Sequence, residues 1–371
     1  MKKFLIGTVV AVLALVCLLS LRPVQGLLLS LFLPPFPQWP QPATTLAADA
    51  HGEIHFQTAS PFDFAVILDG MRGARPTTGL GYLTVPAAAS ADNRLPAMVI
   101  LPGSGGIAAG REHEYAALLQ RHGIAAFVID YYEPRGLGPD QPYLLRTSSV
   151  TEFDIITDAY SALKLLSTSP VIDPQRIGVM GFSYGGMATR FALDDRFRAA
   201  LTPELPGFAL HVDFYGPCFQ KLGTSKTNGA PLLALRGTAD ASNDLAACAQ
   251  REKELEALGV AVERHTFDGA GHAWEVSAPR ATNDKPYIAG CEVDYDAAGH
   301  PSIDGASVAA VDTDISRSER IAARLRSGSA YKGCLHYGYI VGNDEIAKQK
   351  GYSALLAFLE QHFQLPAAPA Q

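Results

Sequence analysis

The fold is decided by one stretch of the chain, residues 176–188, which read RIGVMGFSYGGMA. Its apolar start, Ile177–Met180, predicts a short buried strand, and the small and apolar residues after the turn predict a helix. Residues 181–185 fit the pattern G-x-S-x-G, in which a serine stands strained at the end of a strand. Glycines are needed because the two backbones press together there and a Cβ would clash. We therefore predict that Ser183 is a nucleophile; the alternative is a purely structural glycine-rich turn.

Two backbone N–H groups are expected to bind the oxyanion that such a nucleophile generates. The helix behind Ser183 presents free N–H groups and a positive dipole end, so the N–H of Tyr184 is the first donor. The second is expected in the loop PGSGG at 102–106, after the apolar strand Ala97–Leu101. We assign it to Ser104. A phosphate loop is the competing interpretation, but no lysine follows at the required spacing.

The order of apolar segments predicts the architecture. Glu112–His122 and Val150–Thr168 have helical patterns, and Ile124–Ile129 is another fully apolar strand. Alternation of strand and helix from residue 97 to 181 indicates parallel βαβ units. We expect an α/β fold with a mostly parallel central sheet and helices on both faces. The folded domain is predicted at 76–371.

A base and an acid for the serine are expected at the ends of later strands. A serine hydroxyl is a poor nucleophile until a histidine takes its proton and a carboxylate orients that histidine. His272 follows the predicted strand Val260–Phe267 in a glycine-flanked loop, and Asp240 follows the strand Pro231–Leu235. The remaining nine of the ten histidines lie within strands, before Ser183, or in the later part of the chain. The rivals of Asp240 are Asp213 and Asp244.

Composition excludes several classes of function. The formal net charge of −7 and the absence of a lysine and arginine stripe argue against a nucleic-acid partner. No metal site and no cofactor are predicted, because histidine and aspartate are scattered without a ligand spacing. An acidic group at Glu292, Asp294 and Asp296 offers calcium ligands, but a solvated loop is the favoured interpretation.

The N-terminus indicates a membrane. Lys2 and Lys3 precede an 18-residue run without charge, Phe4–Leu21, and a second apolar run covers Gly26–Leu33. We predict an uncleaved anchor within residues 1–33 that leaves the catalytic domain outside the cytoplasm, in the cell envelope. A cleaved signal peptide, giving a secreted or periplasmic protein, is the alternative. Residues 34–75 are interpreted as a proline-rich spacer and N-terminal extension.

Four cysteines remain after Cys17, which belongs to the apolar run. An even number in an exported protein predicts two disulfides, with three possible connectivities. We favour Cys218–Cys248 and Cys291–Cys334 because each pair falls within one region of the sequence. Four reduced and buried cysteines are the alternative.

The motifs together resemble the dienelactone hydrolase family of α/β-hydrolases. The resemblance covers roughly residues 77–275 and the closing helix, and it rests on segments 102–106, 130–136, 181–186, 237–240 and 271–272. It implies an α/β-hydrolase fold and hydrolysis of an ester. The family's named enzymes carry a cysteine at the nucleophile turn, so Ser183 makes the chain more similar to serine esterase members. Cys218 and Cys248 resemble a pair that recurs in exported members.

Residues 276–344 depart from the compact family pattern and are expected to form an insertion. The insertion begins shortly after His272, so it is placed to shape the substrate pocket. The alternative is a surface addition. Gly105, Arg135 and Trp274 are further candidates for contacts with substrate. For Arg135 the alternative is a salt bridge with Asp130 or Glu133.

The sequence thus predicts a serine hydrolase that cleaves a carboxylic ester through an acyl-enzyme. Two alternatives remain open. One is a serine peptidase of the prolyl-oligopeptidase type, which shares the nucleophile turn but needs room for a propeller that this chain lacks. The other is a non-catalytic envelope binding protein on a hydrolase fold.

Overall fold

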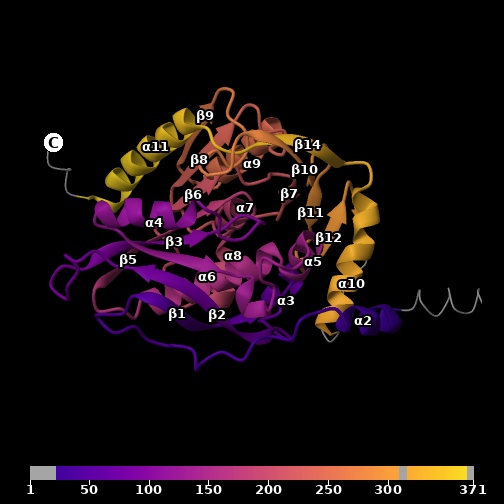
Figure 1. Cartoon of the computed structure of the whole chain (residues 1–371), viewed down its shortest axis with the longest axis horizontal. Helices are drawn as coiled ribbons and strands as arrows, with labels where there is room; N and C mark the ends of the chain where they lie inside the picture. The colour runs from indigo at the N-terminus through magenta and orange to yellow at the C-terminus, as the bar shows by residue number, and fades with distance from the viewer. Residues whose placement is uncertain (1–21, 309–315, 366–371) are drawn as a thin grey trace, which may run out of the picture.

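The centre of the protein is an eight-stranded sheet with the order β1-β2-β4-β3-β5-β6-β8-β9 (Figure 1). The computed structural model describes residues 22–308 and 316–365. Neighbouring strands from β4 to β9 are parallel, whereas β2 pairs antiparallel with both β1 and β4. The strands are β1 Gly52–Ser60, β2 Arg75–Thr84, β3 Leu95–Leu101, β4 Ala125–Asp130, β5 Ile172–Phe182, β6 His211–Phe214, β8 Leu232–Gly237 and β9 Val262–Phe267.

Helices cover both faces of this sheet because successive side chains of each strand point to opposite sides. In β3, Val99 and Leu101 join an apolar core with α6 and α7, whereas Met98 and Ile100 join a second core with α4 and α11. The helices of the hydrolase core are α3 Phe64–Leu68, α4 Glu112–Arg121, η1 Glu133–Arg135, α5 Tyr143–Ser149, α6 Glu152–Leu166, α7 Tyr184–Phe191, α8 Asp195–Leu201, α9 Leu245–Ala257 and α11 Glu345–Phe363. The predicted α/β architecture is confirmed.

The N-terminal extension belongs to the sheet. β1, within the region interpreted as a spacer and extension, pairs along its whole length with β2. The domain boundary predicted between residues 75 and 76 falls one residue into β2 and would separate β1 from the strand with which it pairs. The pattern of residues 52–60 does not define the bounds of β1, because an edge strand with mixed burial lacks the continuous apolar run of the central strands.

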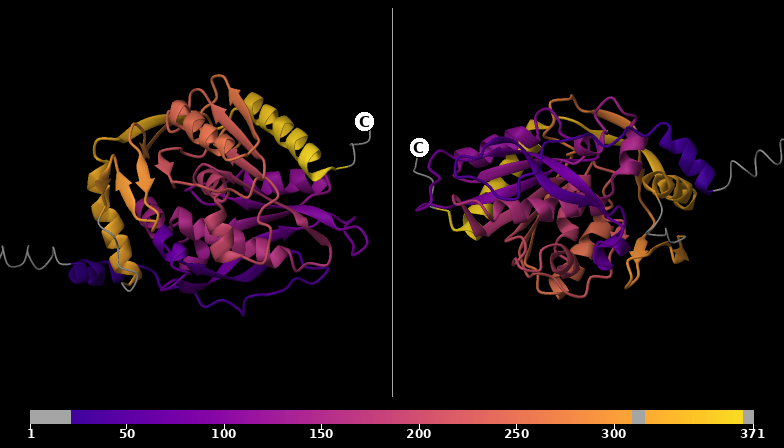
Figure 2. Two further views of the ribbon diagram at one scale, coloured as in Figure 1. Left: turned by 180° about the vertical axis from the view of Figure 1, so that it is seen from behind. Right: turned by 90° about the horizontal axis from the view of Figure 1, so that it is seen from below.

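The insertion is an ordered excursion along one side of the molecule (Figures 1 and 2). It contains a two-stranded sheet of β10 and β14, and β11, β12 and β13 form a small sheet with β7. The disulfide Cys291–Cys334 ties the segment after β10 to the segment before β14, as predicted. The bounds are β7 Gln220–Lys221, β10 Ala281–Ile288, β11 Val293–Tyr295, β12 Pro301–Ile303, β13 Ala306–Ser307, α10 Arg317–Ser327, η2 Gly328–Tyr331 and β14 Leu335–Val341.

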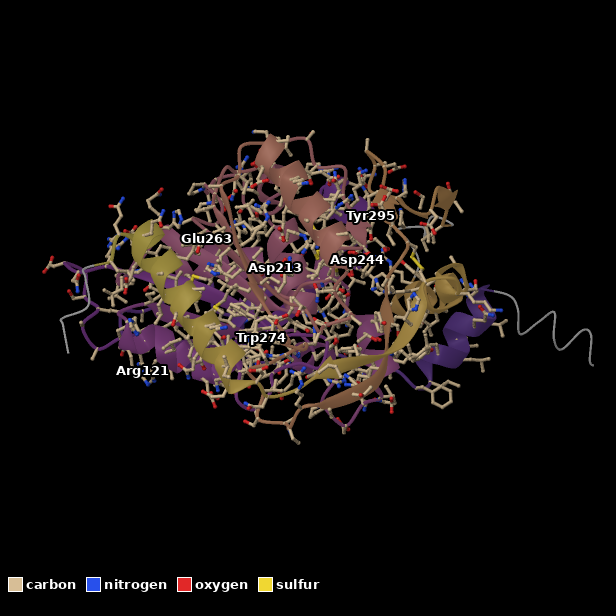
Figure 3. All side chains as sticks on the ribbon, turned by 90° about the horizontal axis from the view of Figure 1, so that it is seen from above. Arg121, Asp213, Asp244, Glu263, Trp274 and Tyr295 are labelled. Carbon is tan, nitrogen blue, oxygen red and sulfur yellow. A yellow bond between two sulfur atoms is a disulfide. The ribbon has the colours of Figure 1, made fainter. Side chains whose placement is uncertain are left out.

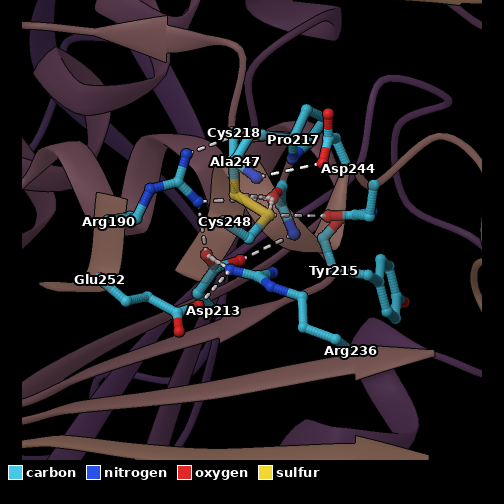
Figure 4. The surroundings of a disulfide bond; sticks show 12 residues. Arg190, Asp213, Tyr215, Pro217, Cys218, Arg236, Asp244, Ala247, Cys248 and Glu252 are labelled. Atoms are coloured by element: carbon cyan, nitrogen blue, oxygen red, sulfur yellow. Dashed lines mark hydrogen bonds and ion pairs between the residues drawn. A yellow bond between two sulfur atoms is a disulfide. The ribbon is translucent and has the colours of Figure 1, made fainter. Parts of the chain in front are cut away.

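The second predicted disulfide, Cys218–Cys248, is also present and joins the segment after β6 to α9 (Figure 4). Beside it, the buried Asp213 makes ion pairs of 2.7 Å with both Arg190 and Arg236. Two arginines offset the cost of burying that carboxylate, so Asp213 has a structural role.

The described part of the chain begins with the helix α2, Arg22–Ser30, which lies against α10 (Figures 1 and 2). Several of its apolar side chains are exposed, among them Leu27 and, just after the helix, Leu31 and Phe32. Within residues 22–308 and 316–365, no helix is long and apolar enough to cross a bilayer. The predicted anchor run Phe4–Leu21 lies outside the described residues.

Candidate active site

Ser183 stands between β5 and α7 in the strained conformation that its motif predicts. Its φ of 53° and ψ of −112° are unfavourable for a residue with a side chain. The flanking glycines permit this turn: a Cβ on Gly181 would collide with the carbonyl of Gly185, and one on Gly185 with that of Leu101. Tyr184 is the first residue of α7, where backbone N–H groups have no partner within the helix.

Asp240 and His272 are paired. His272 Nδ1 lies 2.6 Å from Asp240 Oδ2, and both residues are buried. The histidine loop is held by the insertion, because His272 N donates to Ile340 O at 2.7 Å and Gly342 N donates to His272 O at 3.0 Å. The imidazole is therefore fixed from its side chain and from its backbone.

The carboxylate of Asp240 has its other lone pairs occupied as well. Ser242 donates to Oδ1 from its backbone N at 3.0 Å and from Oγ at 2.5 Å, and Asn243 Nδ2 donates to Oδ2 at 2.8 Å. Burial raises the pKa of Asp240, but the charge of His272 and these hydrogen bonds outweigh it, so the net shift is downward. Asp240 is thus an ionised acceptor. Of the rivals, Asp244 is exposed and caps α9, and Asp213 is paired with arginines (Figure 3).

A cavity of about 550 Å³ brings the predicted residues together. Ser183, His272 and Ser104 all line it, with Tyr184 beside them. Among the described residues no hydrogen bond joins Ser183 Oγ to His272, and such contacts are often long before substrate binds. The insertion supplies much of the remaining wall of the cavity. Of its two interpretations, a segment that shapes the pocket is therefore favoured over a surface addition. The lining residues that it contributes include Tyr287, Tyr295, Arg320, Arg324, Tyr331 and Tyr339.

The predicted oxyanion loop is fixed through its carbonyl groups. Tyr131 OH donates to Gly103 O, Tyr132 OH donates to Ser104 O at 2.9 Å, and Arg146 Nη1 donates to Gly105 O at 3.1 Å. Since these bonds use the carbonyl side of successive peptides, they hold the loop in one orientation while Ser104 borders the cavity.

Three predicted substrate contacts are corrected. Arg135 is 1% exposed and forms a bidentate ion pair with Asp158, with Nη1–Oδ2 at 2.8 Å and Nη2–Oδ1 at 3.1 Å. Arg135 does not line the cavity. Its ion-pair partner is Asp158, whereas the alternative predicted from the sequence was a salt bridge with Asp130 or Glu133. Trp274 is fully buried in the core against aromatic rings (Figure 3). Gly105 lies on the exposed side of its loop and does not line the cavity.

Four residues near the triad were missed from the sequence: Ser242, Asn243, Tyr215 and Glu275. The first two follow Asp240 in a turn whose short polar side chains bond back to an aspartate, which is a readable signal. The Tyr215 ring lies 4.6 Å from the imidazole of His272, and its hydroxyl donates to Glu275 Oε2 at 2.6 Å. No sequence signal indicates that contact, because it joins residues 60 positions apart.

Glu275 makes the stability of the protein depend on pH. Burial raises its pKa from 4.5 to about 7, although Tyr215 and Arg111 oppose the shift, and Oε1 has no hydrogen-bond partner among the described residues. The folded state therefore holds a proton between about pH 4.5 and 7 that the unfolded state has lost. This contribution to stability is complete below about pH 4.5 and is lost as pH rises through about 7.

We expect Glu275→Gln to remove that dependence. Between pH 5 and pH 8.5 the wild type should lose up to roughly 3 kcal/mol of unfolding free energy through this group, and the variant should lose much less. Urea denaturation at the two pH values measures the difference. Glu114→Gln, at an exposed site of α4, is the control and should behave as wild type. An equal loss in Glu275→Gln and wild type would contradict the assignment.

Comparison with known proteins gives the chain its family. Residues 81–299, more than half of the chain, match the dienelactone hydrolase family. A Bradyrhizobium protein assigned as a 2-oxo-3-(5-oxofuran-2-ylidene)propanoate lactonase is 24% identical over 54% of this chain and 81% of its own length. The thiohydrolase apmlB of Arthrinium phaeospermum is 34% identical over 29% of this chain and 34% of its own length.

The solved structures that resemble this chain share about one fifth of its aligned residues. Esterase 2 of Thermogutta terrifontis with bound propionate has a TM-score of 0.43 and 19% identity, covering 53% of this chain and 80% of that one. A Klebsiella pneumoniae protein assigned as a dienelactone hydrolase has a TM-score of 0.42 and 20% identity, covering 60% and 88%. The family match and the parallel sheet agree: this chain belongs to the dienelactone hydrolase family and is a carboxylic ester hydrolase with the α/β-hydrolase fold.

Proposed function

We propose that the enzyme is a serine esterase that works through an acyl-enzyme. One observation carries the proposal: His272, which is paired with Asp240, lines the same cavity as the strained Ser183. A hydroxyl, an imidazole and an ionised carboxylate in that order are the parts that acyl transfer to serine requires.

In this mechanism Ser183 Oγ attacks the ester carbonyl while His272 takes the hydroxyl proton. The N–H groups of Tyr184 and Ser104 bind the tetrahedral oxyanion, and Asp240 stabilises the cationic imidazole. The C–O bond to the leaving alcohol then breaks, and His272 returns the proton to that alcohol. Water, deprotonated by His272, attacks the acyl-enzyme, and the acid product leaves as Ser183 recovers its proton.

The cavity indicates the size of the substrate. A volume of about 550 Å³ is in the range of pockets that hold drug-sized ligands. Its aromatic lining, which includes Phe62, Phe153, Phe219 and several tyrosines, favours an ester with a bulky apolar acyl or alcohol group over an acetate of a small alcohol.

A fluorophosphonate probe and an ester panel test the proposal. The wild type should be labelled covalently, and p-nitrophenyl esters should be hydrolysed with a kcat/KM that rises from acetate to larger acyl groups. Turnover of an aminoacyl amide at a rate equal to or above that of the esters would favour a peptidase. Absence of labelling and of ester turnover would indicate a binding protein.

We also propose that the enzyme is attached to a membrane through its N-terminal segment, with its catalytic domain in the cell envelope outside the cytoplasm. The uncharged run of residues 4–21 ends directly before α2. Leu27 of α2 is 65% exposed, and Leu31 and Phe32, which follow the helix, are 73% and 75% exposed. Exposed apolar side chains next to an apolar run are suited to the interfacial region of a bilayer.

Cell fractionation checks this attachment. We expect the protein to remain in membranes washed with alkaline carbonate, with an intact mass that includes residues 1–33. A soluble extracytoplasmic product shortened at its N-terminus would contradict the anchor and support cleavage of a signal peptide.

A further inference from the structure

A single buried carboxylate connects the nucleophile turn to the insertion. Glu152, the first residue of α6, is 1% exposed and lines the cavity. Its oxygens accept hydrogen bonds from Tyr184 OH at 2.7 Å and Gln220 Nε2 at 2.6 Å, and from Tyr295 OH at 3.5 Å. Arg324 Nη2 lies 3.4 Å from Oε2. A buried carboxylate is tolerated only when it is paired in this way.

The partners come from different parts of the chain. Tyr184 begins α7 directly after the nucleophile, and Gln220 lies in β7. Tyr295 (Figure 3) and Arg324 belong to β11 and α10 of the insertion. Burial raises the pKa of Glu152, but the charge of Arg324 and the hydrogen bonds from Tyr184 and Gln220 outweigh it and lower the pKa overall. The carboxylate is therefore a charged acceptor between the two regions.

The hydrogen bond from Tyr184 to Glu152 links this buried carboxylate to the oxyanion site. Its backbone N–H is the oxyanion donor in the mechanism proposed above, and its phenol is the group that Glu152 holds. A hydrogen bond to an ionised acceptor is short and stronger than one between neutral groups. Oxyanion donors must be aimed within a few tenths of an ångström, and a misplacement of about 1 Å can cost about a hundredfold in rate.

We propose that Glu152 is a positioning residue, which fixes the Tyr184 N–H toward the oxyanion and is itself held by Arg324 of the insertion. The inference rests on the proposed serine mechanism. It makes the insertion part of the catalytic apparatus, because α10 then influences the rate of the chemical step as well as the shape of the pocket.

Glu152→Gln tests the proposal, since the amide keeps the shape of the side chain and removes its charge. We expect kcat to fall about 10- to 100-fold with KM changed by less than about threefold. Phosphonylation by the fluorophosphonate, in which negative charge builds on the phosphoryl oxygen as Ser183 attacks phosphorus and fluoride leaves, should slow by a similar factor. Tyr184→Phe, which removes only the hydroxyl, should give the same losses if the two residues act through one hydrogen bond.

The double variant and a matched control separate positioning from stability. Glu152→Gln combined with Tyr184→Phe should be no slower than either single variant. Asp158→Asn alters another buried carboxylate of α6, paired with Arg135 and outside the cavity lining. It should lower the melting temperature and leave kcat unchanged.

Wild-type kcat in Glu152→Gln and Tyr184→Phe, additive losses in the double variant, or an equal kcat loss in Asp158→Asn would overturn the inference. If Glu152→Gln does not fold, Tyr184→Phe alone decides. Failure of the proposed function looks different, because the wild type would then not react with the fluorophosphonate at all.

Discussion

Ser183→Ala is expected to lower kcat by about 10⁶-fold, with thermal stability close to that of the wild type. The substitution removes the attacking oxygen, and no other group at the end of β5 can form the acyl-enzyme. Because Ser183 stands at a positive φ of 53°, alanine inherits the same strained backbone and gains no new contact. Steady-state hydrolysis of a p-nitrophenyl ester, together with gel detection of the fluorophosphonate adduct, measures the effect.

Ser148→Ala is the matched control for that experiment. Ser148 lines the same cavity, but it lies in α5 and its hydroxyl is occupied by donating to Leu144 O at 2.6 Å. The control should be labelled and should turn over ester at a rate near that of the wild type. An adduct on Ser183→Ala that persists with wild-type intensity would remove Ser183 from the mechanism.

Asp240→Asn should lower kcat by about 10⁴-fold with little change in KM. The amide has the size of the carboxylate but turns one acceptor oxygen into a donor, so the Nδ1–H tautomer of His272 loses its partner. The imidazolium also loses its stabilising charge. The pH–rate profile of both enzymes over pH 4–9 provides the measurement.

The low pKa of Asp240 determines what that profile should show. Since the pKa of the carboxylate is held below its usual value, its titration belongs at or below the acid end of the wild-type profile, and the variant should be slow at every pH. Asp244→Asn is the control, because Asp244 caps α9 from an exposed position and asparagine caps equally well. A rate in Asp240→Asn within tenfold of the wild type would point to another orienting acid.

The central fold was predictable because parallel strands are buried on both faces and read as continuous apolar runs. Ser183 stands directly after such a run, and Asp240 and His272 each stand in a loop that follows a predicted strand, so chain order and strand ends together selected the three residues. The fold then brings Ser183 and His272 to one cavity and pairs Asp240 with His272. The apolar runs and the loops after them are local features of the sequence, so they can be recognised without knowledge of the tertiary contacts.

Contacts between distant segments were not predictable. Arg135 was expected to reach substrate, but its partner Asp158 lies in a different helix, and nothing in the sequence links the two. Trp274 follows His272 closely yet turns into the core. Glu152 lies within the predicted helix Val150–Thr168, but nothing in the sequence indicates its role, since that role depends on partners 32 to 172 positions away. Such contacts depend on tertiary packing, which a pattern along the chain does not encode.

The cystine joins Cys291 to Cys334, 43 positions apart, and closes a loop that holds much of the pocket wall. In contrast, the nucleophile turn depends on β5 and α7, which no cystine crosslinks directly. An enzyme produced in a thiol-rich cytosol would therefore keep its reactive serine while the wall around it is untethered. Preparations from reducing and oxidising hosts should then agree in their reaction with small phosphonates and differ in their preference among large esters, so the choice of expression host affects the measured substrate profile.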